Sequence, residues 1–159
     1  MSSSNETFDV TIIGSGPGGY VAAIRAGQLG LKTAIIEKDK NLGGTCLLRG
    51  CIPTKSLLHT ADLLDEFKHA KEHGIVAGSV SLDFDQAQKR KGKVVLKLSK
   101  GVEFLMRKNK VQVFNGAAHV DGPGRITVTG ADGSTQVVQT KNVVIATGSV
   151  PRSLPNLPI

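Results

Sequence analysis

The chain has 159 residues, of which 40% are hydrophobic, and it carries a formal net charge of +7 at pH 7. This length suits a single globular domain, and no apolar run approaches the roughly 20 residues that a membrane-spanning helix needs. The first residues lack the basic flank and apolar stretch of an export signal, so we expect a cytoplasmic protein with no membrane partner.

The first elements in chain order form a β-α-β unit. Residues 8–13 (FDVTII) are apolar and rich in β-formers, a small-residue stretch that runs to Gly30 suits a helix, and residues 33–36 form a second apolar run. This order predicts two parallel strands joined by a crossover helix, and therefore an α/β fold.

The turn between the first strand and the helix has the pattern Gly14-x-Gly16-x-x-Gly19. Gly14 permits a tight turn, Gly16 lets the backbone approach a pyrophosphate, and Gly19 lets the helix pack closely on the strand. The unpaired N–H groups at the helix amino terminus attract the anion. A glycine-rich turn without a ligand is the alternative, but the β-α-β setting favours a dinucleotide site.

Glu37 ends the second predicted strand, 23 residues after Gly14. A carboxylate at this place accepts hydrogen bonds from the ribose of an adenosine and repels a 2′-phosphate. The glycine turn and Glu37 together fit FAD and NAD equally well.

The two cysteines, Cys46 and Cys51, lie in the segment GGTCLLRGCIPTK. In a regular helix residues five apart point about 140° away from each other, so a disulfide requires distorted backbone. Gly50 permits such distortion, and Pro53 suits the first turn of a following helix. The pair has three interpretations: a redox centre, a metal site, or two unrelated core thiols. Metal is disfavoured, because no zinc-type ligand spacing occurs and only His59 lies nearby in sequence.

Two cations accompany the cysteines. Lys55 follows Cys51 by four residues, so on one helix face it would stabilise a thiolate. Arg49 adds positive charge, although a long arginine near a loop also suits a solvent-facing position. The surroundings therefore favour a reactive thiol over an inert one.

Two further helices are predicted. The first has apolar residues at helical spacing, reaches about His73 and is followed by a glycine-rich linker through Gly78; its apolar positions are Leu57, Ala61 and Leu64. The second lies in residues 89–110, which hold nine Lys or Arg and one acidic residue, with an apolar stripe at Val94, Leu98, Val102 and Leu105. Aromatic residues for base stacking are nearly absent there, so a solvated helix face explains the charge and we expect no nucleic-acid partner.

The last third of the chain reads as short strands separated by turns. The predicted strands are residues 111–114, 118–120, 126–129, 135–138 and 143–146, with Asp132-Gly133 as a hairpin turn. Residues 151–159 contain three prolines, which block a regular element and predict an extended connector.

The sequence resembles the dihydrolipoamide dehydrogenases of the pyridine-nucleotide disulfide oxidoreductase family. The resemblance runs through almost the whole chain and rests on the segments IIGSGPGGYVAAIRAGQLGLKTAIIEK, GGTCLLRGCIPTKSLLH, EHGI, KNKVQVFNGAA and VVIATGS. It implies a Rossmann-like FAD-binding β-α-β domain in residues 1–150, with a small antiparallel β-meander. Residues 151–159 would lead to an NAD-binding domain that this chain lacks.

The resemblance also implies the roles of single residues. Cys46 would exchange with a substrate disulfide, Cys51 would contact the flavin and form a charge-transfer pair with it, and Lys55 would lie against the flavin ring. The implied FAD-contacting residues are Gly14, Gly16, Gly19, Glu37, Lys38, Gly44, Thr45, Cys46, Lys55, Ala118, Thr147 and Gly148. Two departures stand out: Ala118 where glycine is common, and Leu48-Arg49 where many relatives carry Asn-Val.

The implied activity is oxidation of dihydrolipoamide to lipoamide through the cysteine pair and FAD, with NAD as acceptor. The implied partners are the lipoyl group of a 2-oxo acid dehydrogenase complex and a second copy in a homodimer. A glutathione- or mercuric-reductase-like member, and a non-catalytic nucleotide-binding remnant, are the alternatives; EHGI and KNKVQVFNGAA favour lipoamide. The family's chain is roughly three times longer, so we expect this chain alone to be inactive.

Overall fold

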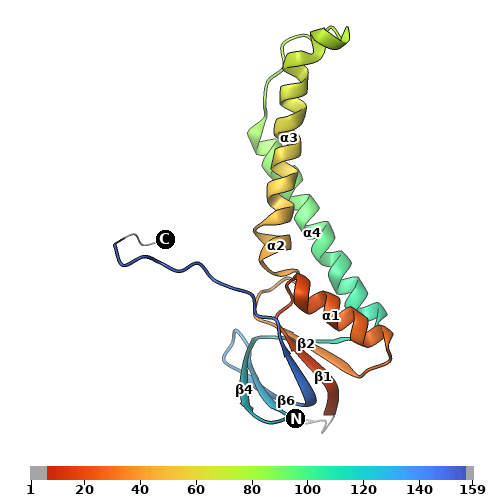
Figure 1. Ribbon diagram of the computed structural model, residues 1–159, viewed down its shortest axis with the longest axis vertical. Helices are drawn as coiled ribbons and strands as arrows, with labels where there is room; N and C mark the ends of the chain where they lie inside the picture. The colour runs from red at the N-terminus through yellow and green to blue at the C-terminus, as the bar shows by residue number, and fades with distance from the viewer. Residues whose placement is uncertain (1–6, 157–159) are drawn as a thin grey trace.

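The computed structural model describes residues 7–156 and shows an α/β fold built on one six-stranded sheet (Figure 1). The strand order is β3-β2-β1-β6-β5-β4. The strands are β1 (Thr7–Ile13), β2 (Thr33–Glu37), β3 (Gln112–Asn115), β4 (Ala117–Gly122), β5 (Arg125–Thr129) and β6 (Thr135–Ile145). β1 pairs in parallel with β2 and β6, and β2 with β3, whereas β4, β5 and β6 form an antiparallel meander. The predicted β-α-β unit and meander are confirmed.

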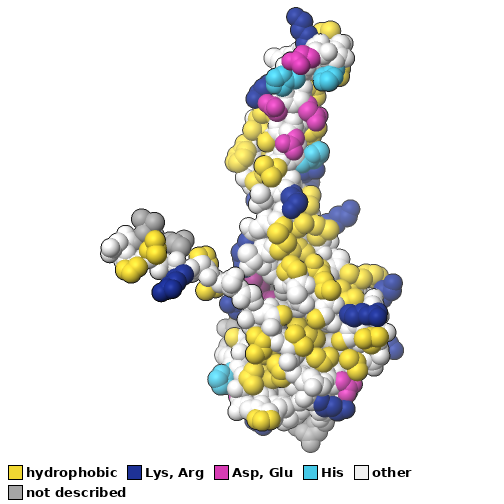
Figure 2. Space-filling model, in the orientation of Figure 1, with side chains coloured by type: hydrophobic (Ala, Val, Ile, Leu, Met, Phe, Trp, Pro, Cys, Tyr) yellow, Lys and Arg dark blue, Asp and Glu magenta, His cyan; other side chains and the backbone are white. Residues whose placement is uncertain are grey.

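In chain order, α1 lies between β1 and β2, and the other helices lie between β2 and β3. They are α1 (Pro17–Gln28), α2 (Gly44–Leu48), α3 (Cys51–His69), the 3₁₀ turn η1 (Ala70–His73) and α4 (Phe84–Lys108). α3 and α4 pack against each other as a long hairpin that projects away from the sheet (Figure 1). Figure 2 shows apolar side chains gathered near the base of the molecule and charged ones toward the hairpin tip.

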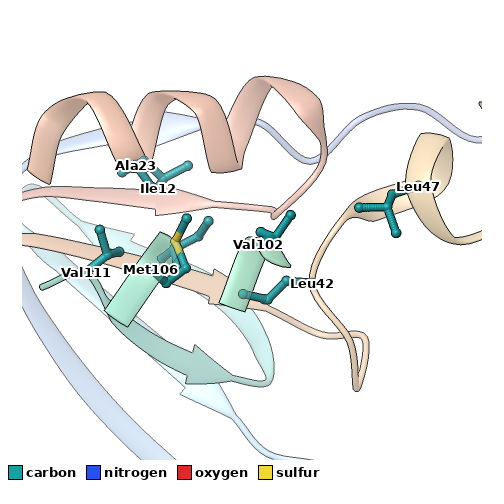
Figure 3. Close-up of a cluster of buried hydrophobic side chains, with 8 residues drawn as sticks. Ile12, Ala23, Leu42, Leu47, Val102, Met106 and Val111 are labelled. Atoms are coloured by element: carbon teal, nitrogen blue, oxygen red, sulfur yellow. The ribbon is translucent and has the colours of Figure 1, made fainter. Parts of the chain in front are cut away.

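The core consists of two clusters. In the first, Ile12 of β1 packs with Ala23 of α1 and Met106 of α4, so α1 and α4 cover one face of the sheet (Figure 3). In the second, Phe8, Ile36 and other side chains of the parallel strands pack with side chains of β5 and β6. The parallel strands are therefore buried on both faces, as their nearly continuous apolar sequence requires.

The structure corrects two predictions about the elements. Residues 135–145 form one continuous strand, not two. The polar residues in its middle remain in the sheet because their side chains bind Asp9 of β1. Lys141 Nζ lies 2.8 Å from Asp9 Oδ1, and Asn142 Nδ2 donates to Asp9 O at 3.0 Å. On α4 the buried positions are Ala87, Ser99, Val102 and Met106. Of the predicted stripe, Leu98 is 41% exposed and Leu105 is 36% exposed.

The predicted hairpin turn is confirmed, since Gly133 adopts a left-handed φ of 79° between β5 and β6. α4 begins earlier than the basic segment suggested, at a cap in which Asp83 Oδ1 accepts from Gln86 N at 2.9 Å. No helix in residues 7–156 is both long enough and apolar enough to cross a membrane.

Candidate dinucleotide and disulfide site

The candidate site lies where the carboxyl ends of the parallel strands meet. Gly14 N donates to Ile36 O, and Ala146 N donates to Ile13 O, both at 2.8 Å. These bonds place the turns after β1, β2 and β6 at one edge of the sheet. That edge is where open α/β sheets bind their ligands.

The glycine turn has the geometry that its spacing predicts. Gly14 has φ +98°, and a Cβ there would overlap Ala146 O. A Cβ on Gly19 would overlap Gly14 O, so this glycine is what brings α1 onto β1. Gly16 has open space on its Cβ side, with no other residue's atom within 4 Å. Space at Gly16, beside the amino terminus of α1, fits an approaching pyrophosphate.

Glu37 is held by a residue that the sequence analysis did not single out. Ser15 is fully buried, and both its N (2.8 Å) and its Oγ (2.6 Å) donate to Glu37 Oε2. The other carboxylate oxygen, Oε1, accepts from Asp39 N at 2.9 Å. Because a carboxylate oxygen accepts more than one hydrogen bond, Oε1 retains capacity for a ribose hydroxyl. The predicted ribose contact remains a prediction that this geometry allows.

The segment before the cysteines packs directly on the glycine turn. Gly43 N donates to Ser15 O and Ser15 Oγ, both at 3.1 Å. Gly44 has φ +62°, and a Cβ there would overlap Gly16 Cα. Ser99 Oγ of α4 donates to Leu42 O at 2.7 Å and fixes the segment from the other side. Residues 42–44 therefore form a second wall of the space beside Gly16.

Cys46 and Cys51 form a disulfide, with their Cα atoms 4.7 Å apart. The chain achieves this as expected, by interrupting the helix: α2 ends at Leu48 and α3 begins at Cys51. At the break, a Cβ on Gly50 would lie 3.1 Å from Thr45 O, so the backbone folds back closely on α2. Within residues 7–156, no group of three or more His, Cys, Asp or Glu side chains is arranged to hold a metal ion.

The predicted cations lie in different surroundings. Lys55 is exposed on α3, one turn after Cys51. Arg49 does not present a free charge to the cysteines, since its guanidinium lies 2.6 Å from Asp39 Oδ2. Lys38 is exposed directly after β2.

The remaining predicted cofactor residues lie at the same edge. Gly116 N donates to Glu37 O at 2.8 Å, which brings the start of β4, and with it Ala118, beside the end of β2. Thr147 and Gly148 follow β6 and are exposed. The fold thus gathers the predicted residues around one sheet edge.

A largely apolar cavity of about 530 Å³ opens beside Cys46. It lies between α1, α2, α3 and α4, and its lining residues are Pro17, Tyr20, Cys46, Leu47, Ile52, Leu98, Gly101, Val102, Phe104 and Leu105. Leu98 and Leu105, which were expected in the core, therefore line a cavity at the disulfide instead.

Comparison with known proteins gives the family. Residues 8–158 match the model of the pyridine nucleotide-disulphide oxidoreductase family. The chain belongs to this family. Its members bind FAD and NAD.

Similar curated proteins are mostly dihydrolipoyl dehydrogenases. The chain is 47% identical over 155 residues to that of Chlorobaculum parvum, covering 98% of this chain and 33% of the relative. It is 48% identical over 153 residues to that of Trypanosoma brucei brucei, covering 95% and 32%. A leghemoglobin reductase of Vigna unguiculata is 48% identical over 160 residues, covering 100% and 31%. The chain thus spans about a third of the length of these relatives.

Proposed function

We propose that this chain is the FAD-binding part of a dihydrolipoyl dehydrogenase, with Cys46 and Cys51 as its redox-active pair. The observation that carries the proposal is the contact of Gly44 with Gly16, because it places the disulfide two residues away from the wall of the dinucleotide space. Residues 1–150 form the cofactor domain in this proposal, and residues 151–159 lead out of it.

The chain's own residues would hold FAD in a defined way. The amino terminus of α1 and the open side of Gly16 would receive the pyrophosphate, and Glu37, held by Ser15, would accept from the adenosine ribose. The start of β4 at Ala118 would offer backbone to the adenine. Lys55, exposed on α3 near Cys51, would reach the flavin ring.

The disulfide would accept two electrons from a dithiol substrate. A substrate thiolate attacks one sulfur and forms a mixed disulfide, and its second thiol then closes the substrate disulfide and leaves both cysteines reduced. FAD, when bound, would accept this electron pair from the two thiols. In the whole protein, NAD would then accept the electrons from FAD.

The cavity at Cys46 favours a substrate with an apolar carbon chain. Its lining is aliphatic and aromatic apart from the cysteine itself, which suits the hydrocarbon arm and ring of a lipoyl group. A glutathione-like substrate carries charged groups, and none of the residues that line this cavity has a charged side chain to pair with them. We therefore propose the lipoyl group of a 2-oxo acid dehydrogenase complex as substrate, in a cytoplasmic homodimer.

FAD binding by the purified 159-residue chain tests the proposal. Titration with FAD, followed by absorbance and flavin fluorescence, should give saturable binding. Gly16→Ala should weaken FAD binding at least tenfold, because the new methyl group projects into the space that the pyrophosphate would occupy. Gly92→Ala on α4, where a Cβ also meets nothing within 4 Å, is the matched control. Failure of the wild type to bind FAD, or equal binding by Gly16→Ala, would contradict the proposal.

A spectrum of the FAD-loaded chain tests the cysteines separately. Reduction with two electrons from dithionite should produce a long-wavelength shoulder on the flavin band if Cys51 lies against the ring. Cys51→Ser should lack the shoulder, and Ser81→Ala, an exposed position in the 74–83 connection, should keep it.

A further inference from the structure

Asp39 lies in the loop after β2, and Arg49 lies between Cys46 and Cys51. Among the ion pairs of the described residues, only the Arg49–Asp39 pair joins these two segments. Arg49 Nη2 lies 2.6 Å from Asp39 Oδ2, and the two side chains are 59% and 26% exposed. The pair lies at the surface, but Asp39 is partly covered and has a second tie, because its N donates to Glu37 Oε1. Glu37 is the acceptor proposed for the adenosine ribose.

Arg49 occupies the turn between the two cysteines. Its N donates to Thr45 O at 2.9 Å at the end of α2. The next residue, Gly50, is the N-cap of α3 and lies close to Thr45 and Cys46. Within the turn, the disulfide is a covalent tie between α2 and α3. The Arg49 side chain is a non-covalent tie from the same turn to the loop after β2.

We propose that the Arg49–Asp39 pair is a positioning element that keeps Cys46 and Cys51 within bonding reach while their disulfide is open. In the disulfide form the covalent bond already fixes the turn, so the ion pair adds little order. In the dithiol form the ion pair restricts the turn and raises the effective concentration of one thiol at the other. The inference rests on the proposed redox role of the cysteines.

An alternative role for Arg49 makes the opposite prediction. An unpaired arginine beside the cysteines would stabilise thiolates and so favour the reduced form. Here the guanidinium charge is paired with Asp39, so its removal should act through the order of the turn. Loss of either partner should then have the same effect.

The test is the equilibrium of the purified chain with glutathione at pH 7, without added FAD. The reaction is protein disulfide plus two glutathione thiols giving two protein thiols plus glutathione disulfide, and the reduced fraction is measured by thiol alkylation and mass spectrometry. Arg49→Ala and Asp39→Asn should each make the disulfide about two- to fivefold easier to reduce, the range of an exposed ion pair. Arg49→Lys should restore most of the wild-type value.

Lys40→Ala, which removes an exposed cation from the same loop, is the control and should match the wild type. Opposite shifts in Arg49→Ala and Asp39→Asn would assign Arg49 to thiolate stabilisation and overturn the inference, as would wild-type values in both. A wild-type chain that does not re-form its disulfide would overturn the inference together with the redox part of the proposed function. Circular dichroism of each variant establishes that the fold is retained.

Discussion

Ser15 links the glycine turn to both neighbouring loops, through Glu37 and Gly43. Ser15→Ala removes the hydroxyl and leaves the buried Glu37 carboxylate with one donor fewer, a loss that costs about 1–3 kcal/mol for a buried polar group. We expect a fall of that size in the free energy of unfolding, measured with urea. Ser81→Ala, at an exposed position, should change it little. Equal free energies of unfolding for Ser15→Ala and Ser81→Ala would contradict a structural role for the Ser15 hydroxyl.

Gly19 sets how closely α1 approaches β1. In Gly19→Ala the new Cβ overlaps Gly14 O, so helix and strand must separate, and overpacking of this kind costs about 1–3 kcal/mol. The neighbouring Gly18→Ala is the matched control, because a Cβ there meets nothing within 4 Å and alanine is the better helix former. Thermal unfolding should show Gly19→Ala below the wild type and Gly18→Ala at or above it. The reverse order would contradict the packing.

At the level of elements, Asp9 ties β1 to β6 and to the start of β2. The pKa of its carboxyl lies below its ordinary value, chiefly because Lys141 hydrogen-bonds it and then because Lys32 N does. The unfolded chain therefore binds the proton at higher pH than the folded chain, and the stabilisation is present above about pH 4 and is lost as pH falls through the lowered pKa. Melting temperatures between about pH 2 and 5 should fall less steeply for Asp9→Asn than for the wild type. Asp62→Asn, on the exposed face of α3, should follow the wild type.

Met106 decides which face of α4 is the core face. It is fully buried with Ile12 and Ala23, whereas its neighbour Leu105 lines the cavity at Cys46. Met106→Ala should lower the free energy of unfolding by about 2–5 kcal/mol, as for other large-to-small changes in a core. Leu105→Ala should cost clearly less. Similar losses for the two variants would favour the stripe that the sequence predicted.

The sequence predicted elements best where local chemistry determines them. The glycine turn works because strand, spacing and helix agree, and the break between the cysteines follows from Gly50 and helix geometry. The predicted stripe on α4 was right at Val102 but wrong at Leu98 and Leu105. The buried face is shifted because Ser99 is buried for its hydrogen bond to Leu42 O, a tertiary contact that hydrophobic periodicity does not encode. β6 was divided in two because Lys141 and Asn142 look like a turn until their partner Asp9 is known. Ser15 and the Arg49–Asp39 pair depend on contacts between loops, which no local pattern reveals.

At the scale of the whole molecule, the sheet and the hairpin differ in how much they bury. Both core clusters consist of side chains from the sheet, α1, α2, the linking loops and the end of α4 near the sheet. Between residues 60 and 95 the hairpin is almost entirely exposed, with Ala70 and Ala87 as its buried side chains. Charged side chains cover much of its tip in Figure 2. Its stability therefore depends on helix-to-helix contact alone.

This difference predicts two levels of amide hydrogen exchange. β1 and β2 are covered on both faces of the sheet, so their amides should exchange only through global unfolding. Residues 60–90 should open locally, and their amides should exchange at least ten times faster. Mass spectrometry of peptides from both regions measures the two rates in one sample. Addition of FAD should slow exchange in residues 12–19 and 37–46, which the proposed cofactor would cover, and leave residues 60–90 unchanged. Equal protection of hairpin and sheet would mean that contacts other than those between α3 and α4 hold the hairpin. Slower exchange at the hairpin tip on adding FAD would mean that the cofactor binds there and not at the proposed site.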